Sequence, residues 1–160
     1  MPNKSRTLAL IAPLALLVSV VSPAQAASPS AGPGAITSGL AGKCADDLGD
    51  AAADGTVVDL YDCNTGPAQQ WTVPGDGTVR INGKCLDVTG RATANGTLVE
   101  LWDCNGGSNQ TWVPQPDGSL KSAQSGRCLD DPGYRTTNGT QLVIWDCNGG
   151  VNQQWAPPTT

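Results

Sequence analysis

The sequence of 160 residues contains no histidine and no phenylalanine, and Glu100 is its only glutamate. Without histidine, the chain has no Ser-His-Asp triad and no zinc site that uses histidine ligands. Acidic residues outnumber basic ones by 14 to 9, which gives a formal net charge of −5. An acidic protein is a poor partner for nucleic acid or for an anionic membrane surface. The composition therefore argues against these partners, and no metal or cofactor is expected.

The N-terminus lacks an uninterrupted apolar run of the roughly 20 residues that a membrane-spanning helix needs. Two basic residues precede a short apolar stretch over residues 8–21, and small residues follow at Ala24 and Ala26. This order is typical of a secretory signal with a cleavage site. We predict a signal peptide over residues 1–26 and a secreted, extracellular protein, with a retained membrane anchor as the alternative.

Residues 27–39 are rich in serine, proline, glycine and alanine. Such a composition favours a flexible segment, because it offers little apolar surface to bury. We predict a flexible leader over residues 27–39 and a folded domain over residues 40–157.

Six cysteines form three pairs with the same internal spacing, and a tryptophan lies eight residues after each second cysteine. The three sets are Cys44, Cys63 and Trp71; Cys85, Cys104 and Trp112; and Cys128, Cys147 and Trp155. The chain is thus one motif written three times. Units of this size rarely bury a core alone, so we predict one monomeric domain in which three repeats share an interior.

An even number of cysteines in an exported chain favours disulfides. The threefold repetition leaves two pairings, either within each repeat or from each repeat to the next. Pairing within the repeats is favoured, as Cys44-Cys63, Cys85-Cys104 and Cys128-Cys147. Each bridge would contribute on the order of 3 kcal/mol to stability, and no free thiol would remain as a nucleophile.

No part of the chain after the signal shows sustained helical periodicity, which predicts an all-β protein. An extended segment precedes each second cysteine, over residues 56–63, 97–104 and 140–147, and begins after an Asp-Gly or Asn-Gly turn. Asn95 and Asn138 also match glycosylation sequons, but the turn is the better-supported role because Asp54 occupies the same register.

Alternation along these strands separates two faces. The aliphatic face carries Val58 and Leu60, Val99 and Leu101, and Leu142 and Ile144. The other face carries Tyr61, Trp102 and Trp145 together with the cysteines. We predict that these three aromatics are exposed, whereas Trp71, Trp112 and Trp155 fill a core that has no phenylalanine.

An aspartate two residues after each first cysteine should lie on the aromatic face. If the bridged strands are antiparallel with the cysteines opposite one another, Asp87 faces Trp102 directly, with Cβ atoms roughly 5 Å apart. The same construction pairs Asp46 with Tyr61 and Asp130 with Trp145. A carboxylate beside an exposed ring suits a sugar, because the ring stacks on the C–H face and the carboxylate accepts hydrogen bonds from hydroxyls.

Amides near each Gln-x-Trp segment could add polar contacts. These are Asn109 and Gln110, and Asn152 and Gln153. The alternative role is turn formation and satisfaction of backbone groups, and for the glutamines it is the favoured one.

The Cys-Leu-Asp, Leu-Trp-Asp-Cys and Gln-x-Trp pieces resemble the ricin B-type lectin domain, a β-trefoil, and are similar to family 13 carbohydrate-binding modules of secreted bacterial proteins. The resemblance covers about residues 35–157. It implies one sugar site per repeat, formed by the aspartate, the aromatic and the amide pair. In the first repeat the amide pair reads Ala68 and Gln69, and Ala45 replaces a leucine, so that site lacks one contact.

The resemblance predicts a secreted, non-catalytic module that binds galactose-, xylose- or arabinose-containing glycans. An enzyme is disfavoured, because glycoside hydrolysis needs opposed carboxylates across one cleft and the repeated aspartates belong to separate units. A protein-binding β-trefoil such as a protease inhibitor is the main alternative. A calcium site is a further one, although no acidic run has the spacing of an EF-hand loop.

Overall fold

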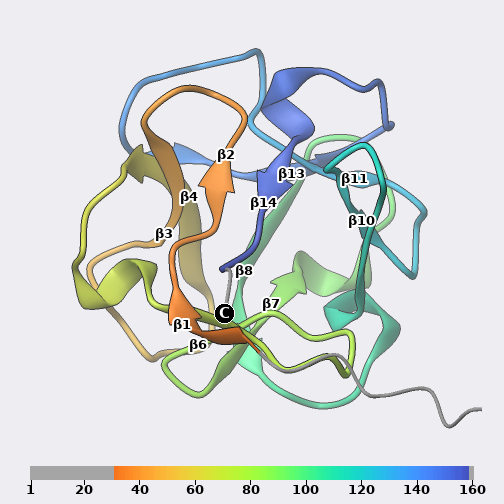
Figure 1. Cartoon of the computed structure of the whole chain (residues 1–160). Coiled ribbons are helices and arrows are strands. Elements are labelled where there is room, and N and C mark those ends of the chain that lie inside the picture. Colours follow the sequence, from red (N-terminus) through yellow and green to blue (C-terminus); the bar gives the residue numbers. More distant parts are fainter. Residues whose placement is uncertain (1–30, 159–160) are drawn as a thin grey trace, which may run out of the picture.

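Each repeat contributes one antiparallel strand pair to the computed structural model, which describes residues 31–158. The three pairs are β3 (Lys43–Asp47) with β4 (Thr56–Asp62), β7 (Lys84–Val88) with β8 (Thr97–Asp103), and β11 (Cys128–Asp130) with β13 (Val143–Trp145). Figure 1 shows the repeats following one another around the molecule, from orange through green to blue.

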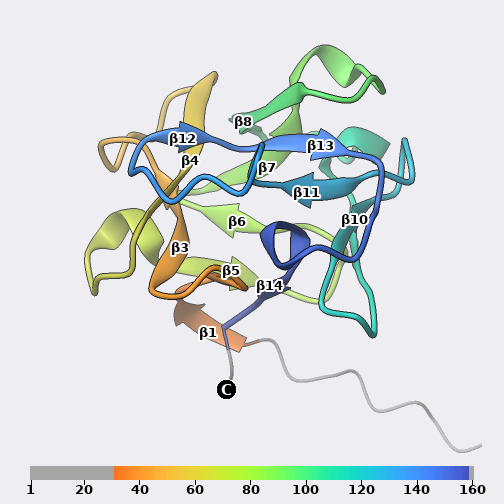
Figure 2. The ribbon, with the colours of Figure 1, turned by 90° about the horizontal axis from the view of Figure 1, so that it is seen from above.

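The strand pairs join into a closed ring. β4 pairs with β8, β8 pairs with β13, and β12 (Thr140–Gln141) pairs back with β4. β12 and β13 follow one another across the upper half of Figure 2, separated only by Leu142. Because every repeat uses its neighbours to complete its pairing, the three repeats fold as one unit, as predicted.

Shorter elements cover the ring. The remaining strands are β1 (Ala31–Gly34), β2 (Thr37–Ser38), β5 (Trp71–Val73), β6 (Arg80–Ile81), β9 (Trp112–Pro114), β10 (Leu120–Ser122) and β14 (Trp155–Ala156). Four 3₁₀ turns complete the fold, η1 (Pro67–Gln69), η2 (Thr89–Arg91), η3 (Ser108–Gln110) and η4 (Val151–Gln153). The all-β β-trefoil predicted from the sequence is confirmed.

The turns before β4, β8 and β12 have the predicted chemistry. Gly55, Gly96 and Gly139 adopt φ values of 84°, 82° and 85°, a left-handed conformation that glycine reaches without a steric penalty. Each turn directs the chain into a strand whose residues alternate between the interior and the outer face.

The interior is filled as the alternation predicts. The aliphatic residues of the inner face, Val58, Leu60, Val99, Leu101, Leu142 and Ile144, are all fully buried. Trp71, Trp112 and Trp155 lie in the same cluster, and their indole N–H groups donate to the backbone carbonyl oxygens of residues 45, 86 and 129 at 2.9–3.0 Å. The tryptophans thus supply apolar volume without leaving a buried donor unpaired.

All three disulfides close within the repeats, as favoured from the sequence. The Cα–Cα distances are 5.0 Å for Cys44–Cys63 and 5.1 Å for the other two bridges.

The predicted flexible leader is corrected over the part that the structure describes. β1 pairs with β5, and β2 pairs with both β14 and β3. Ile36, between β1 and β2, is 3% exposed and belongs to the core. The composition of residues 27–39 concealed this, because one isoleucine and a few backbone hydrogen bonds suffice to hold a short edge strand. The folded domain therefore begins before residue 40.

The predicted signal peptide, residues 1–26, lies outside the described residues. Among the helices of residues 31–158, none has the length and apolar character required to span a bilayer.

Candidate functional site

The aspartate and the aromatic residue of each repeat share the outer face, but their register differs from the prediction by two residues. Asp87 lies opposite Glu100, and Trp102 lies opposite Cys85. The same shift places Asp46 opposite Asp59, and Asp130 opposite Val143. The prediction assumed that bridged cysteines face one another directly, whereas each bridge runs diagonally to a cysteine just beyond the end of its strand.

The three aromatics keep the exposure that the prediction requires. Tyr61 and Trp102 are each 41% exposed, and Trp145 is 42% exposed. Because a shift of two residues preserves the face in a β-strand, each ring remains a diagonal neighbour of its aspartate. The aspartate therefore forms the floor of a depression, and the ring stands beside it.

Two amides hold each of the aspartates in the second and third repeats. Asn109 Nδ2 and Gln110 Nε2 donate to Oδ2 of Asp87 at 2.8 and 2.7 Å. Asn152 Nδ2 and Gln153 Nε2 donate to Oδ2 of Asp130 at 2.9 and 2.7 Å. Both donors in each repeat reach the same carboxylate oxygen, so the other oxygen, Oδ1, is left for a ligand.

The glutamines lie behind the aspartates. Gln110 uses its second amide hydrogen on the Asp103 carbonyl, and its Oε1 accepts from the Asn105 backbone N–H. Gln153 repeats this arrangement with Asp146 and Asn148. Their side chains are fully buried, so the structure places them as positioning residues and not on the pocket surface.

Burial raises the pKa of Asp87 above its ordinary value, and hydrogen bonds from Gln110 and Asn109 oppose this rise. The pKa of Asp130 is raised by burial in the same way, against hydrogen bonds from Gln153 and Asn152. The amides therefore help to keep a desolvated carboxylate in its charged form, which is the stronger hydrogen-bond acceptor.

Each of these two aspartates lies in an open pocket. The second-repeat pocket has a volume of about 240 Å³ and is lined by Asp87, Gly90, Arg91, Glu100, Trp102, Asn105 and Asn109. The third-repeat pocket has a volume of about 380 Å³ and is lined by Asp130, Pro132, Gly133, Tyr134, Arg135, Trp145, Asn148 and Asn152. The predicted aspartate, indole and asparagine thus come together in both repeats.

Sequence reasoning missed several residues of these pockets. Arg91 and Tyr134 occupy equivalent positions, six residues after the first cysteine, and Asn105 and Asn148 follow the second cysteine. A repeated Cys-Asn-Gly-Gly segment could have pointed to the asparagines. Nothing about the residue type marked Arg91 and Tyr134, since this position differs in every repeat.

The first repeat departs from the other two. Gln69 Nε2 still donates to Asp46 Oδ2 at 2.8 Å, but Ala68 stands where the others have asparagine. Asp50, which occupies the position of Arg91 and Tyr134, accepts a hydrogen bond from Asn82 at 2.9 Å. The first repeat therefore keeps its aspartate and Tyr61. It has neither the second amide nor a basic or aromatic residue six positions after its first cysteine.

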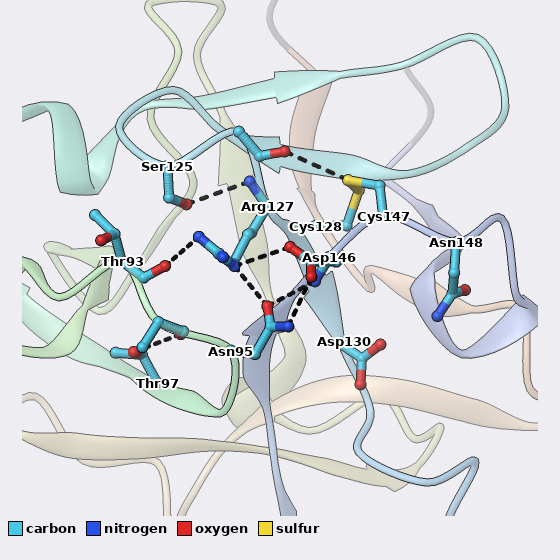
Figure 3. Close-up of polar contacts among 12 residues, drawn as sticks. Thr93, Asn95, Thr97, Ser125, Arg127, Cys128, Asp130, Asp146, Cys147 and Asn148 are labelled. Carbon is cyan, nitrogen blue, oxygen red and sulfur yellow. Dashed lines mark hydrogen bonds and ion pairs between the residues drawn. A yellow bond between two sulfur atoms is a disulfide. The ribbon is translucent and has the colours of Figure 1, made fainter.

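A polar clamp joins consecutive repeats beside each site, and Figure 3 shows the one next to the third site. Asn95 donates from Nδ2 to Asp146 Oδ2 at 2.8 Å, and its Oδ1 accepts from the Asp146 backbone N–H at 2.9 Å and from Arg127 Nε at 2.5 Å. Arg127 also contacts the Thr93 carbonyl. The side chain of Asn95 thus bonds to the next repeat through both its amide nitrogen and its amide oxygen.

The same clamp recurs at the other junctions. Asn138 binds Asp62 and Lys43, and Asp54 binds Asp103 and Lys84. Each clamp ties the turn of one repeat to the strand pair of another, so the pockets are held in place across repeat boundaries.

Metal ligation was the remaining chemical possibility for these acidic side chains. Within residues 31–158, no group of three or more acidic, cysteine or histidine side chains is arranged to hold a metal ion.

Residues 32–155 match the model of the ricin-type β-trefoil lectin domain. The chain belongs to this family. The lectin domain is similar to ThreeFoil, a designed threefold-symmetric protein, with 32% identity and a TM-score of 0.70 over 77% of this chain and 95% of that chain.

The lectin domain is also similar to a non-toxic homologue of type II RIPs from Momordica charantia (bitter gourd), solved with α-methyl-D-galactoside. The identity is 31% and the TM-score 0.72, over 81% of this chain and 48% of that chain. The C-half of an earthworm R-type lectin, solved with GalNAc, shares the fold at 21% identity and a TM-score of 0.67, over 78% of this chain and 96% of that chain.

Proposed function

We propose that this protein is a secreted, non-catalytic carbohydrate-binding module with working sites in its second and third repeats. One observation carries the proposal. In both repeats two amides bind the same oxygen of a buried aspartate, which leaves Oδ1 facing a pocket that an exposed indole borders. A sugar fits this arrangement, since neighbouring hydroxyls donate to the carboxylate while the C–H face of the ring packs on the indole.

The ligand class is proposed as galactose-, xylose- or arabinose-containing glycans. Two proteins of similar fold were solved with a methyl galactoside and with GalNAc, which supports the galactose member of this set. In the second and third repeats, the binding residues are the aspartate, the tryptophan and the asparagine at the pocket. The first repeat, with Asp46 and Tyr61 but Ala68 in place of asparagine, would bind more weakly.

Secretion is proposed from the N-terminal sequence together with the three disulfides. Disulfides of this kind persist in oxidising compartments outside the cytosol. Shallow pockets that hold one sugar bind weakly, so retention on a polysaccharide would come from several sites acting together. Linked sites raise apparent affinity by about 10² to 10⁴.

Retention on immobilised galactose and on an arabinoxylan column tests the function. The wild-type protein should be retained, and the double variant Asp87→Ala, Asp130→Ala should elute in the void volume. Asp117→Ala changes an aspartate outside both pockets and serves as the matched control, with retention unchanged. Trp102→Ala with Trp145→Ala removes only exposed rings and should also abolish retention while the thermal unfolding curve stays cooperative.

Equal retention of the wild type and the folded double variants would refute the site assignment. No retention of the wild type on any glycan matrix, combined with inhibition of a protease, would instead favour the protein-binding alternative.

A further inference from the structure

The residue six positions after the first cysteine has an unusual conformation in every repeat. Asp50, Arg91 and Tyr134 have φ values of 53°, 58° and 56°, which non-glycine residues seldom adopt. Glycine precedes each of them, also with positive φ. Such conformations carry a steric cost and cluster at functional sites. In the second and third repeats this residue lines the sugar pocket proposed above.

In the second repeat the Arg91 side chain contacts Asn109, which lines the same pocket. Its Nε donates to Asn109 Oδ1 at 3.1 Å. A Cβ atom on Gly107 would collide with Arg91 Nη2, so the guanidinium rests directly against the backbone there. The acceptor oxygen of Asn109 is therefore already used by the protein itself.

In the third repeat the equivalent acceptor, Asn152 Oδ1, is buried and has no partner among the described residues. Asn152 is 2% exposed. Its Nδ2 is held by Asp130 Oδ2 and by the Asp131 carbonyl at 3.0 Å, which orients the amide. A Cβ atom on Gly150 would collide with both this oxygen and the Tyr134 hydroxyl. Tyr134 therefore packs beside the asparagine oxygen in the third repeat, as Arg91 does in the second.

Tyr134 also changes the shape and polarity of its pocket. It is 53% exposed, and its ring lines the same pocket as Trp145. This pocket is larger, at about 380 Å³ against about 240 Å³ in the second repeat. Each pocket has one arginine, Arg91 in the second and Arg135 in the third, but only the second also has Glu100. Glu100 would have to give up water to admit a neutral ring.

We propose that the residue six positions after the first cysteine sets the specificity of each site, and that the third repeat is the principal site for neutral sugars. There a pyranose contacts both Trp145 and Tyr134. The second pocket has Arg91 in place of this second ring, which makes that site the weaker one for a neutral sugar. The inference rests on the proposed function, because it ranks the sites of the same ligand class.

Calorimetric titration with methyl galactoside and xylobiose on single-site variants tests the ranking. In an Asp46→Ala background, which removes the first-repeat site, Asp87→Ala leaves the third site to be measured, and Asp130→Ala leaves the second. The dissociation constant for neutral sugar should be at least about tenfold lower for the third site than for the second, which corresponds to about 1.4 kcal/mol.

Exchanging Arg91 and Tyr134 between the two sites separates their effect from that of the aspartates. Both residues already adopt the same backbone conformation, so each should accept the other side chain. Tyr134→Arg in the Asp87→Ala protein should weaken binding about tenfold, and Arg91→Tyr in the Asp130→Ala protein should strengthen it. Tyr134→Phe keeps the ring and should bind within about twofold of its parent.

Equal affinities of the two single-site proteins, or exchanges that leave both affinities unchanged, would overturn this inference while sugar binding itself stands. A wild-type protein that binds neither sugar at any concentration would instead overturn the proposed function.

Discussion

Asp59 has a carboxyl group that is buried in the protein interior. It is 1% exposed, and among the described residues neither of its oxygens has a hydrogen-bond partner. Burial, followed by the nearby charges of Asp46 and Asp47, raises its pKa to about 7. The folded protein therefore holds this proton over a range in which the unfolded chain has already released it. Stability from Asp59 is lost as the pH rises from about 4 to about 7.

Replacing Asp59 with asparagine should make the protein more stable at pH 8, because the variant has no charge to bury. The gain has a ceiling of about 4 kcal/mol, from 1.36 kcal/mol per pKa unit. Thermal unfolding at pH 5 and pH 8 measures it, and the wild-type difference between these conditions should shrink in the variant. Asp131, whose pKa is raised to about 6, leaves some of the slope in place. A variant with the wild-type pH dependence would show that Asp59 is charged and stabilised in some other way.

At the scale of the element, the clamps decide how firmly one repeat holds the next. Asn95 and Asn138 serve two of the junctions and Asp54 the third. Lys84 lies between Asp54 and Asp103 at 2.7 and 2.5 Å, which lowers the pKa of Asp54. The lysine thus allows two acidic residues to share a junction where the other repeats place an amide.

Asn95→Ala should destabilise the protein by about 1–2 kcal/mol, because the Asp146 backbone N–H and Arg127 both lose an acceptor. Chemical denaturation measures the change. Asn95→Asp is the matched control, since it copies the arrangement at Asp54 and keeps the acceptor oxygens beside Arg127. Its loss should be smaller than that of Asn95→Ala. An alanine variant as stable as the wild type would mean that the clamp adds nothing beyond the strand pairing.

At the scale of the whole molecule, three bridges and a shared interior replace three separate cores. Each repeat alone has one strand pair and one core tryptophan, and the ring closes only when β12 pairs with β4. A disulfide across 19 residues restricts the unfolded chain, an effect of about 3 kcal/mol in the chain-entropy account. The disulfides and core tryptophans are therefore distributed equally over the repeats, whereas the binding residues are not.

Substituting serine for both Cys85 and Cys104 should lower the melting temperature by roughly 10 °C, from about 3 kcal/mol in a domain of this size. Differential scanning calorimetry measures the shift. The protein should still unfold in one transition, because the two remaining bridges and the ring persist. Two separate transitions would contradict the view that the repeats form one cooperative unit.

Much of the architecture could be predicted because it follows from local repetition. The cysteine spacing, the Asn-Gly and Asp-Gly turns and the alternation of Val99, Leu101 and Trp102 are readable along the chain. The diagonal path of each disulfide was not readable, because it depends on where a strand ends relative to its partner. That single shift brought Glu100 opposite Asp87 and moved Trp102 to a diagonal position.

The sequence by itself determined the three repeats and the face on which each aspartate lies, since these depend on spacing along the chain, and it favoured the pairing of cysteines within each repeat. Only the tertiary structure decided that residues 31–39 join the sheet, that Asp59 is buried and that Arg91 and Tyr134 border the pockets. These outcomes arise from contacts between repeats and from left-handed turns, where residues distant in sequence share space. They separate two pockets that look equivalent along the chain into one bordered by two aromatic rings and one bordered by a single ring and Arg91.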